Sequence, residues 1–516
     1  MEIEKISLVG DLKMRTKKSF LNLLTDLIPL IIISILGIFK LKLFIDILGD
    51  KTLGLYQLYS QVMVYVALVD GGLSSALLFA LYKPNSSGNT EKFKEIIAAG
   101  YKVFALIGMI IFGLTAILSP FVHYLIKDTI FSNWFVAITF LIFALSNVVE
   151  YFFVPQRTIL EVKEKKYVLN ICIQTAQILL SIVEIIMLLF HCKFIYILLM
   201  HVIIRLLSNI AVAICCKKIY PEYNVKGLTK KDFEFTKQIK HLVFHKINGL
   251  VVYNIDVILI SSILGLSAVA IYSTYNYVIN MLRNILGKIS GSITAIIGNY
   301  LSEGNEKKSH ELFDEMRSMM FFVAIIISVP LFFALGNFID IWYEGKIETQ
   351  FLITFAFSIY MYIYIIKIPT TTFVTSAGLF KETKISALCD TVINLVLSLL
   401  LIFKTGISGV VFATAFSSFI AEYIMKTNVL YKHVFTKKKS TEFYRKNIKF
   451  LIFTLFDLLI GYLIFMNIKI TNILSWFLIY ALYFIVNAIL IYVAFYIFKE
   501  TKFINRFKYL LKKETN

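Results

Sequence analysis

A long series of apolar stretches constrains this chain more than any other feature of its sequence. Each stretch is about 20 residues long or longer, enough for a helix rising about 1.5 Å per residue to cross the roughly 30 Å hydrocarbon core of a bilayer. The stretches lie near residues 19–40, 53–82, 96–119, 131–154, 167–190, 194–215, 241–264, 267–299, 316–336, 350–377, 385–403, 406–429, 450–467 and 473–497. The pattern predicts an all-α polytopic membrane protein with fourteen transmembrane helices.

The composition agrees with this class of protein. Apolar residues make up 58% of the chain and charged residues 16%, against about 45–50% and about 25% in ordinary soluble domains. We therefore exclude a water-soluble enzyme. The net charge of +19 would suit a nucleic-acid partner, but membrane proteins also keep an excess of lysine and arginine in their cytoplasmic loops.

The distribution of the basic residues decides between these two interpretations. With the N-terminus inside, the inner segments hold 39 of the 52 lysines and arginines, and five lie within spans. The other eight lie in outer loops, among them Lys40 and Lys42 after the first span. This asymmetry favours fourteen spans, both termini in the cytoplasm and no nucleic-acid partner. The basic loops are expected to contact anionic membrane lipids.

An internal repeat relates the two halves of the chain. A shift of 216 residues places the second span on the eighth without a gap, and the identical pairs are Leu48/Leu264, Gly49/Gly265, Tyr56/Tyr272, Tyr59/Tyr275, Val62/Val278, Gly71/Gly287 and Ser74/Ser290. Because the shift passes six spans, matching helices enter the membrane from the same side, which implies two parallel six-helix lobes. Repeats of this kind usually enclose a binding site near the membrane midplane.

The spans and the repeat predict the following organisation. The order is a cytoplasmic segment at 1–18, an N-lobe at 19–215, a cytoplasmic loop at 216–240, a C-lobe at 241–429, a basic cytoplasmic loop at 430–449, two further spans within 450–497 and a cytoplasmic tail at 498–516.

Short runs in both lobes resemble a known family. The first is Leu68 to Ala76, which contains an aspartate before two glycines, and continues to Pro84. The second lobe contains Asn254 to Ile260 and then Leu264 to Tyr272. These runs, and the order of spans over nearly the whole chain, resemble the bacterial polysaccharide repeat-unit (O-antigen or capsule) flippases of the multidrug/oligosaccharidyl-lipid/polysaccharide (MOP) exporter superfamily.

The resemblance implies a MATE-like architecture of two six-helix lobes plus two C-terminal helices. It also implies a function: translocation of undecaprenyl-diphosphate-linked oligosaccharide from the inner to the outer leaflet of the bacterial plasma membrane by alternating access, for capsule, O-antigen or exopolysaccharide synthesis. The implied partners are the lipid-linked oligosaccharide and membrane lipids, with glycan polymerases and glycosyltransferases as further candidates.

Three alternatives stay open. Peptidoglycan-precursor flippases also have fourteen spans, but they typically carry arginines on the first, second and eighth spans. Here the first two spans hold Asp26, Gln61 and Asp70, and only Arg283 fits. A multidrug antiporter would want an acidic cavity and generally stops at twelve spans. A multi-span polysaccharide polymerase, the enzyme alternative, would want a long outer loop with arginines, which this chain lacks.

Two arginines near the middle of predicted spans are the first candidates for binding the substrate. Arg283 lies in the eighth span and Arg205 in the sixth, where a charge is costly unless it faces a wet cavity or a partner. A guanidinium binds phosphate oxygens in a bidentate way, so both suit a diphosphate. The alternative is an interhelical salt bridge with Glu184, Glu150 or Asp256.

Three lysines complete the predicted cationic site. Lys288 and Lys246 lie nearer the cytoplasmic ends of their spans, where they either snorkel to the headgroups or help to recruit the diphosphate. Lys367 precedes Pro369 and the threonines at 370–372. A proline within a span frees a carbonyl group, so this segment is expected to be a kink, which serves either as a hinge or as ordinary packing.

Three aspartates are candidates for binding a coupling ion. Asp256 lies in the seventh span, where its carboxylate can carry a proton or, with Asn254 and Asn280, hold Na⁺. Asp26 and Asp70 lie on the first two spans. The alternative for Asp70 is that the Asp-Gly-Gly run shapes a break in the helix.

Other motifs predict no cofactor beyond a coupling proton or Na⁺. The chain has no G-x-x-x-x-G-K-[ST] loop for nucleotide phosphates. His241 and His245 are spaced for one helix face, but the run lacks the glutamate of H-E-x-x-H. Five cysteines lie scattered without C-x-x-C spacing. We therefore predict neither a metal site nor a catalytic residue.

Overall fold

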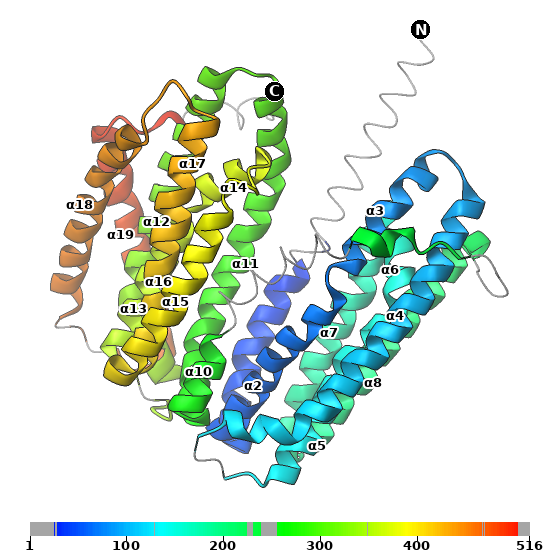
Figure 1. The fold of residues 1–516 in the computed structure, drawn as a ribbon. Helices are drawn as coiled ribbons and strands as arrows, with labels where there is room; N and C mark the ends of the chain where they lie inside the picture. The colour runs from blue at the N-terminus through cyan, green and yellow to red at the C-terminus, as the bar shows by residue number, and fades with distance from the viewer. Residues whose placement is uncertain are drawn as a thin grey trace, which may run out of the picture. The chain divides into compact units, whose positions relative to one another are not determined.

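The computed structural model describes Thr25 and residues 28–127, 130–223, 231–238, 255–347, 349–466, 468 and 470–503. The regular elements in these ranges are all helices (Figure 1). The chain divides into two compact units, here called the N-unit (Met1–Leu250 with Val257–Ala270) and the C-unit (Val251–Asp256 with Ile271–Asn516).

The N-unit begins with a helix at Ile28–Leu48. The helices that follow are α2 (Asp50–Val66), η1 (Ala67–Asp70), α3 (Leu73–Ser86), α4 (Thr90–Leu118), η2 (Ser119–Leu125), α5 (Asn133–Val148), η3 (Val149–Phe153), α6 (Val154–Val162), α7 (Lys166–Leu189), α8 (Phe194–Ile219), η4 (Pro221–Tyr223) and η5 (Glu234–Gln238). The next helix is α10 (Asp256–Ile263). Its first residue, Asp256, belongs to the C-unit, and its other residues belong to the N-unit.

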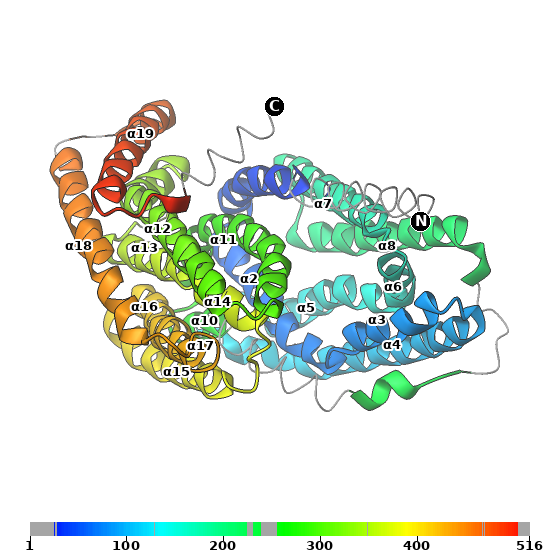
Figure 2. The same ribbon diagram turned by 90° about the horizontal axis from the view of Figure 1, so that it is seen from above.

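The C-unit contains most of the long helix α11 (Leu266–Ser302) and all the helices after it. They are α12 (Glu306–Trp342), α13 (Phe351–Ile366), α14 (Ile368–Ser376), α15 (Lys384–Thr405), α16 (Ile407–Ser418), the π-helical segment η6 (Phe419–Met425), α17 (Lys426–His433), α18 (Ser440–Phe465) and α19 (Ile473–Ile497). Both α18 and α19 pack against α12 at the edge of this unit (Figure 2).

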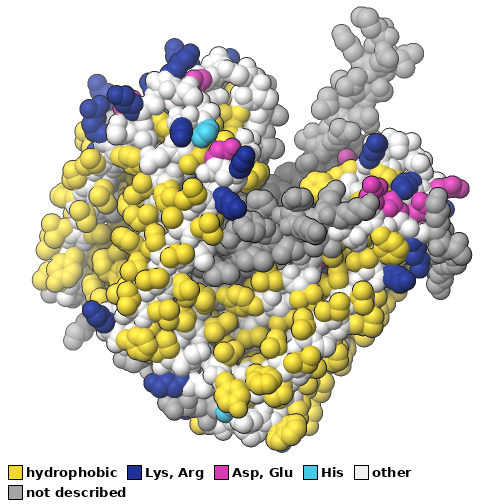
Figure 3. Space-filling model, in the orientation of Figure 1, with side chains coloured by type: hydrophobic (Ala, Val, Ile, Leu, Met, Phe, Trp, Pro, Cys, Tyr) yellow, Lys and Arg dark blue, Asp and Glu magenta, His cyan; other side chains and the backbone are white. Residues whose placement is uncertain are grey.

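Twelve helices in the described ranges are long and apolar enough to cross a membrane. They correspond to all the predicted spans except the seventh and the eighth. The eighth is α11, whose 37 residues are long enough but more polar. The predicted seventh span lies largely outside the described residues. Large apolar side chains cover the sides of the helices, whereas lysines and arginines gather near helix ends (Figure 3).

The first span differs from its prediction. Its described helix runs from Ile28 to Leu48 and therefore includes Lys40 and Lys42, so their assignment to an outer loop is wrong. The reason is tertiary: the ammonium of Lys40 lies 3.0 Å from the carboxylate of Glu184 on α7. A lysine neutralised in this way does not end a transmembrane helix.

Three breaks interrupt long helices where the sequence contains helix-breaking or strained residues. Gly71 and Gly72 have φ values of 56° and 87° between η1 and α3, a conformation that glycine adopts without steric cost. Lys367 separates α13 from α14, next to Pro369, which lacks an amide hydrogen. The third break is the π-helical turn η6, a feature often found at functional sites.

The repeated tyrosines are core residues in both units. Tyr59 is fully buried and its ring lies beside Phe143 of α5, while Tyr275 is fully buried and stacks on Phe357 of α13. Each unit thus packs the equivalent tyrosine against its fourth span.

Candidate functional site

The N-unit contains a buried cluster around Glu184 of α7. One carboxylate oxygen lies 3.0 Å from Nζ of Lys40 and the other lies 2.5 Å from Nε2 of His201 on α8. Glu184 and His201 are each 2% exposed. The ring of Tyr56 on α2 packs edge-on against His201. Four helices therefore meet at one neutralised carboxylate.

A second cluster lies around Glu150 in the short helix η3. Arg205 of α8 and Arg157 of α6 each donate to this carboxylate, at 2.9 Å and 3.1 Å. Arg205 also donates to Asn147 at 3.0 Å, and Arg157 donates to Asn209 at 2.7 Å. The sequence left a salt bridge open as the alternative for Arg205, and the geometry contains that salt bridge.

Both clusters line one polar cavity of about 180 Å³ in the N-unit. Five charged side chains line this cavity. They are the cations Lys40, Arg157 and Arg205 and the carboxylates Glu150 and Glu184. The cavity is large enough for water and its lining carries one excess positive charge.

Asp70 lies apart from this cavity, at the helix break. It ends η1, directly before Gly71, and is 6% exposed. Its carboxylate accepts a hydrogen bond of 3.2 Å from Ser74 on α3. This geometry matches the alternative in which the Asp-Gly-Gly run shapes the break.

In the C-unit, Arg283 of α11 is surrounded by aromatic and amide groups. Its guanidinium donates to Asn280 at 3.1 Å and lies over the rings of Tyr360 and Tyr364, 5.5 Å and 4.9 Å from their centroids. The side chain is half-buried. An arginine stacked in this way presents an edge that can bind phosphate or carboxylate oxygens.

Asp256 lies close enough to Arg283 to interact electrostatically, at the centre of a buried polar cluster. Tyr272 and Thr414 donate to one of its oxygens at 3.2 Å and 3.3 Å, and Asn394 donates to Thr414 at 2.9 Å. The expected neighbour Asn280 instead accepts from Arg283, and Asn254 lies outside the described residues.

Buried oxygens of Asp256 and of three residues on α15 lack hydrogen-bond partners among the residues that the structure describes. They are Oδ1 of Asp256, Oδ1 of Asp390, Oδ1 of Asn394 and Oγ of Ser398. All four side chains are at most 5% exposed, and the last three lie on one face of α15. Orphaned buried oxygens are rare in folded proteins, and oxygen atoms are the ligands that small hard cations prefer.

Lys367 forms the third buried ion cluster. Its ammonium contacts Glu422 in the π-helical turn and donates to Ser418 at 2.6 Å, while Lys426 lies 2.8 Å from the other oxygen of Glu422. Lys367 is 4% exposed and also lies over the ring of Tyr364. The predicted kink is therefore present, and an ion pair joins it to the break in the twelfth span.

The remaining predicted site residues lie elsewhere. Lys288 is exposed on α11 and belongs to none of these clusters. Lys246, Asp26, His241 and His245 lie outside the described residues.

Sequence reasoning missed several members of the clusters, chiefly Arg157, Asp390, Asn394, Thr414 and Glu422. The usable signal was a carboxylate inside a predicted span, as for Asp390 and Glu422. The polar neutral members gave no such signal, since serine, threonine and asparagine are common on helix–helix interfaces in membranes.

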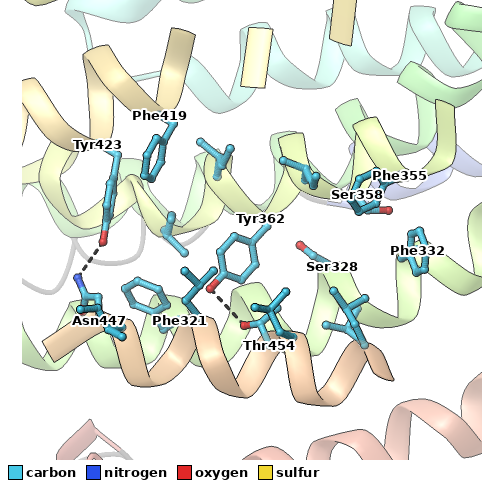
Figure 4. Close-up of a pocket in the computed structure, with 18 of the residues that line it drawn as sticks. Phe321, Ser328, Phe332, Phe355, Ser358, Tyr362, Phe419, Tyr423, Asn447 and Thr454 are labelled. Carbon is cyan, nitrogen blue, oxygen red and sulfur yellow. Dashed lines mark hydrogen bonds between the residues drawn. The ribbon is translucent and has the colours of Figure 1, made fainter. Parts of the chain in front are cut away.

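An apolar cavity of about 460 Å³ lies in the C-unit between α12, α13, η6 and α18. Phenylalanine, isoleucine and leucine side chains form most of its wall (Figure 4). Four of its polar side chains are paired with one another, because Thr454 donates to Tyr362 at 3.3 Å and Asn447 donates to Tyr423 at 2.8 Å. Such a space suits a hydrocarbon chain.

Comparisons with known proteins find this fold among solved structures. No protein-family model matches the chain, and no curated protein matches it in sequence. Among solved structures, "Lipid II flippase MurJ, inward closed conformation" matches with a TM-score of 0.69 and 17% identity, over 91% of this chain and 98% of that one.

Two drug-transporter structures match less of the chain. An inward-facing multidrug resistance MATE family transporter of the MOP superfamily has a TM-score of 0.61 and 14% identity, over 76% of this chain and 92% of its own. The Vibrio cholerae MATE transporter VcmN has a TM-score of 0.53 and 14% identity, over 81% and 99%. The chain is a multi-pass membrane protein with the fold of the MOP-superfamily flippases and transporters.

Proposed function

We propose that the protein is a flippase that carries undecaprenyl-diphosphate-linked oligosaccharide from the inner to the outer leaflet of the bacterial plasma membrane by alternating access. The observation that carries this proposal is the apolar cavity beside α18, in the same unit as Arg283. A substrate with a long hydrocarbon tail and an anionic head matches this pair of features, whereas a small cationic drug matches neither.

Arg283 is the proposed contact for the diphosphate. Its aromatic neighbours Tyr360 and Tyr364 stack on the guanidinium plane, and a guanidinium binds phosphate oxygens in a bidentate way. Arg205 ranks second, because Glu150 already neutralises part of its charge. Lys288 and Lys246 are proposed to attract the diphosphate at the inner leaflet.

Asp256 is the proposed coupling residue, with H⁺ or Na⁺ as the ion. A comparison within the chain supports this role. Lys40 and Asp256 are separated by 216 residues, as are their neighbours Tyr56 and Tyr272. The N-unit has a tethered ammonium at this position, whereas the C-unit has a buried carboxylate, one oxygen of which lacks a hydrogen-bond partner in the described part of the chain. A bound cation would supply in the C-unit the charge that Lys40 supplies in the N-unit.

A peptidoglycan-precursor lipid is the second candidate substrate. The lipid II flippase matches more of this chain than the two MATE transporters do, and its extra coverage fits the presence of α18 and α19. Both candidate substrates share a polyprenyl diphosphate, so the apolar cavity and Arg283 do not distinguish them.

The test is leaflet translocation in proteoliposomes. A fluorescent lipid-diphosphate oligosaccharide and fluorescent lipid II are offered separately to the intact chain and to Arg283→Ala, with the exposed Arg445→Ala as the matched control. We expect the intact chain to translocate the oligosaccharide lipid. Arg283→Ala is expected to lower the translocation rate at least about tenfold, or by about 1.4 kcal/mol. The control variant is expected to keep the rate of the intact chain.

The other outcomes each exclude part of the proposal. Faster movement of lipid II would assign the protein to peptidoglycan synthesis. Export of a cationic dye with no movement of either lipid would replace the flippase by an antiporter. Equal rates for Arg283→Ala and the intact chain would remove Arg283 from the site.

A further inference from the structure

The C-terminal helix pair contains one charged residue where none is expected. In α18 the basic residues and Glu442 lie in the first ten positions, and Asp457 stands alone in the apolar remainder. The partner helix α19 contains no charged residue between Ile473 and Ile497. Asp457 also lies outside the internal repeat and outside the clusters around Arg283 and Asp256.

Asp457 points into the protein and not into lipid. It is 1% exposed and shares the inward face of α18 with Phe450, Thr454 and Gly461. Neighbouring positions such as Leu455 and Leu459 are more than half exposed. On α19, Tyr483 and Asn487 are 5% and 0% exposed.

Asp457, Asn487 and Tyr483 form one polar group with unused hydrogen-bonding capacity. The three side chains are electrostatic neighbours. Both carboxylate oxygens of Asp457, both amide atoms of Asn487 and the hydroxyl of Tyr483 lack a hydrogen bond of ordinary geometry in the described part of the chain. An uncompensated buried carboxylate would cost several kcal/mol.

No side chain on the adjoining helix α12 supplies the missing charge. Between Arg317 and Asp340 this helix contains no charged residue. In the layer of Asp457 it contributes the ring of Phe333, next to Tyr483, and Asn337, which donates to Tyr480 at 2.9 Å. The titratable groups facing Asp457 are thus Tyr483 and, one turn away, Tyr480. Among the residues that the structure describes, none of these helices supplies a counter-charge to Asp457.

We propose that Asp457, Asn487 and Tyr483 form a proton-binding site in the C-terminal helix pair, separate from the coupling site proposed at Asp256. A proton from water binds one carboxylate oxygen of Asp457, and the resulting O–H group donates to the side-chain carbonyl of Asn487. The site is then neutral and satisfies orphaned atoms on both helices.

The position of the site connects it to the apolar cavity. Thr454 lies one turn before Asp457 and forms part of the cavity wall. Gly461 lies one turn after it, where an added Cβ would come within 2.3 Å of Phe333 and 2.5 Å of Tyr483. Because α18 is packed this tightly, loss of the proton places a bare charge between α18 and α19 and loosens the wall of the cavity.

Infrared difference spectroscopy of the full chain in lipid nanodiscs tests this inference without any substrate. We expect the carbonyl stretch of a protonated carboxyl group in acidic buffer, its loss in alkaline buffer and its shift in heavy water. Asp457→Asn, which keeps the shape of the side chain, is expected to lack this band. Asn487→Leu is expected to shift its frequency, because the acceptor is removed.

Asp256→Asn is the matched control and is expected to keep the band, so failure of the proposed transport function does not affect this test. Thermal unfolding in detergent verifies that each variant is folded. A spectrum unchanged by Asp457→Asn, or a band that does not change with pH, would overturn the inference. Loss of the band on adding Na⁺ at constant pH would also overturn it, because the ligand would then be a metal ion.

Discussion

The two units contain an equivalent ion pair with its charges reversed. In the N-unit the carboxylate of Glu150 lies on the fourth span and pairs with Arg205 on the sixth. In the C-unit Lys367 lies on the fourth span of the repeat and pairs with Glu422 on the sixth. Lys367 follows Glu150 by 217 residues, and Glu422 follows Arg205 by the same number. This shift is one residue more than the shift that aligns the second and eighth spans.

The two pairs also share their surroundings. Each fourth span is interrupted at its charged residue, by η3 before Pro155 and by the break before Pro369. Each carboxylate is shared by a second cation, Arg157 in the N-unit and Lys426 in the C-unit. We infer from this reversal that the fold requires an ion pair between the fourth and sixth spans of each unit. It does not require a particular charge on either span.

The two units differ where a substrate or ion is expected to bind. The position of Arg283 corresponds to Ala67 in the first half of the repeat, and the position of Asp256 corresponds to Lys40. The N-unit thus pairs Lys40 with its own carboxylate Glu184, and the C-unit contains two charged residues, Arg283 and Asp256, that depart from the repeat. Charges that depart from the repeat are better functional candidates than charges that obey it.

The largest expected effect comes from removing the shared carboxylate of one unit. Glu422→Gln leaves Lys367 and Lys426 without their partner in a nearly water-free site and is expected to lower the free energy of unfolding by about 3–5 kcal/mol. Glu150→Gln should cost less, because the Glu150 side chain is 36% exposed against 12% for Glu422. Denaturant unfolding in detergent measures both; equal losses would contradict the comparison.

Exchanging the charges of the C-unit pair tests whether their sign is free. Lys367→Glu alone places two carboxylates side by side and is expected to destabilise the chain. Combining it with Glu422→Lys reproduces the order found in the N-unit and should recover about 0.5–3 kcal/mol relative to the sum of the single variants. A double-mutant cycle from thermal unfolding gives this coupling, and strictly additive losses would mean that sign matters.

Neutralising the symmetry-breaking carboxylate should affect ion coupling more than stability. Asp256→Asn is expected to abolish the dependence of lipid translocation on a proton or Na⁺ gradient and to lower the driven rate at least about tenfold, or about 1.4 kcal/mol. Lys40→Met, at the equivalent position of the N-unit, is expected to keep that dependence while destabilising the fold. Translocation with and without each gradient distinguishes them, and a retained gradient effect in Asp256→Asn would disprove the assignment.

The smallest expected effect concerns a network of the C-unit without an equivalent in the repeat. Glu500, after α19, accepts from Arg317 and Lys449. Burial raises the pKa of this carboxyl, but Arg317 and Lys449 outweigh burial and hold the pKa below its ordinary value. The stabilisation is therefore present above the ordinary glutamate pKa and is lost as pH falls through the lower folded-state value.

Glu500→Gln is expected to remove that acid-side loss, at a smaller cost near neutral pH than Glu422→Gln, because Asp314 and Asn447 still pair with Arg317. Between neutral and acidic pH, the melting temperature of Glu500→Gln is expected to fall less than that of the intact chain. An identical profile for the intact chain would show that the network contributes nothing measurable.

Hydropathy predicted most of the spans because a transmembrane helix must satisfy its backbone hydrogen bonds internally and cover itself with apolar side chains, and both needs are local. The breaks at Gly71 and Lys367 were predicted for the same reason, since glycine and proline act through their own backbone. The first span was ended too early because Lys40 has the charge of a loop residue, whereas in the structure Glu184 neutralises it within the helix.

By itself the sequence determined the membrane class, the positions of most spans and the residues whose charge is costly in lipid. Only the tertiary structure decided which of those charges are paired. Glu184 lies 144 residues from Lys40 in sequence and Thr414 lies 158 from Asp256. Hydropathy is a property of each segment, whereas the neutralisation of a buried charge depends on which distant helix faces it.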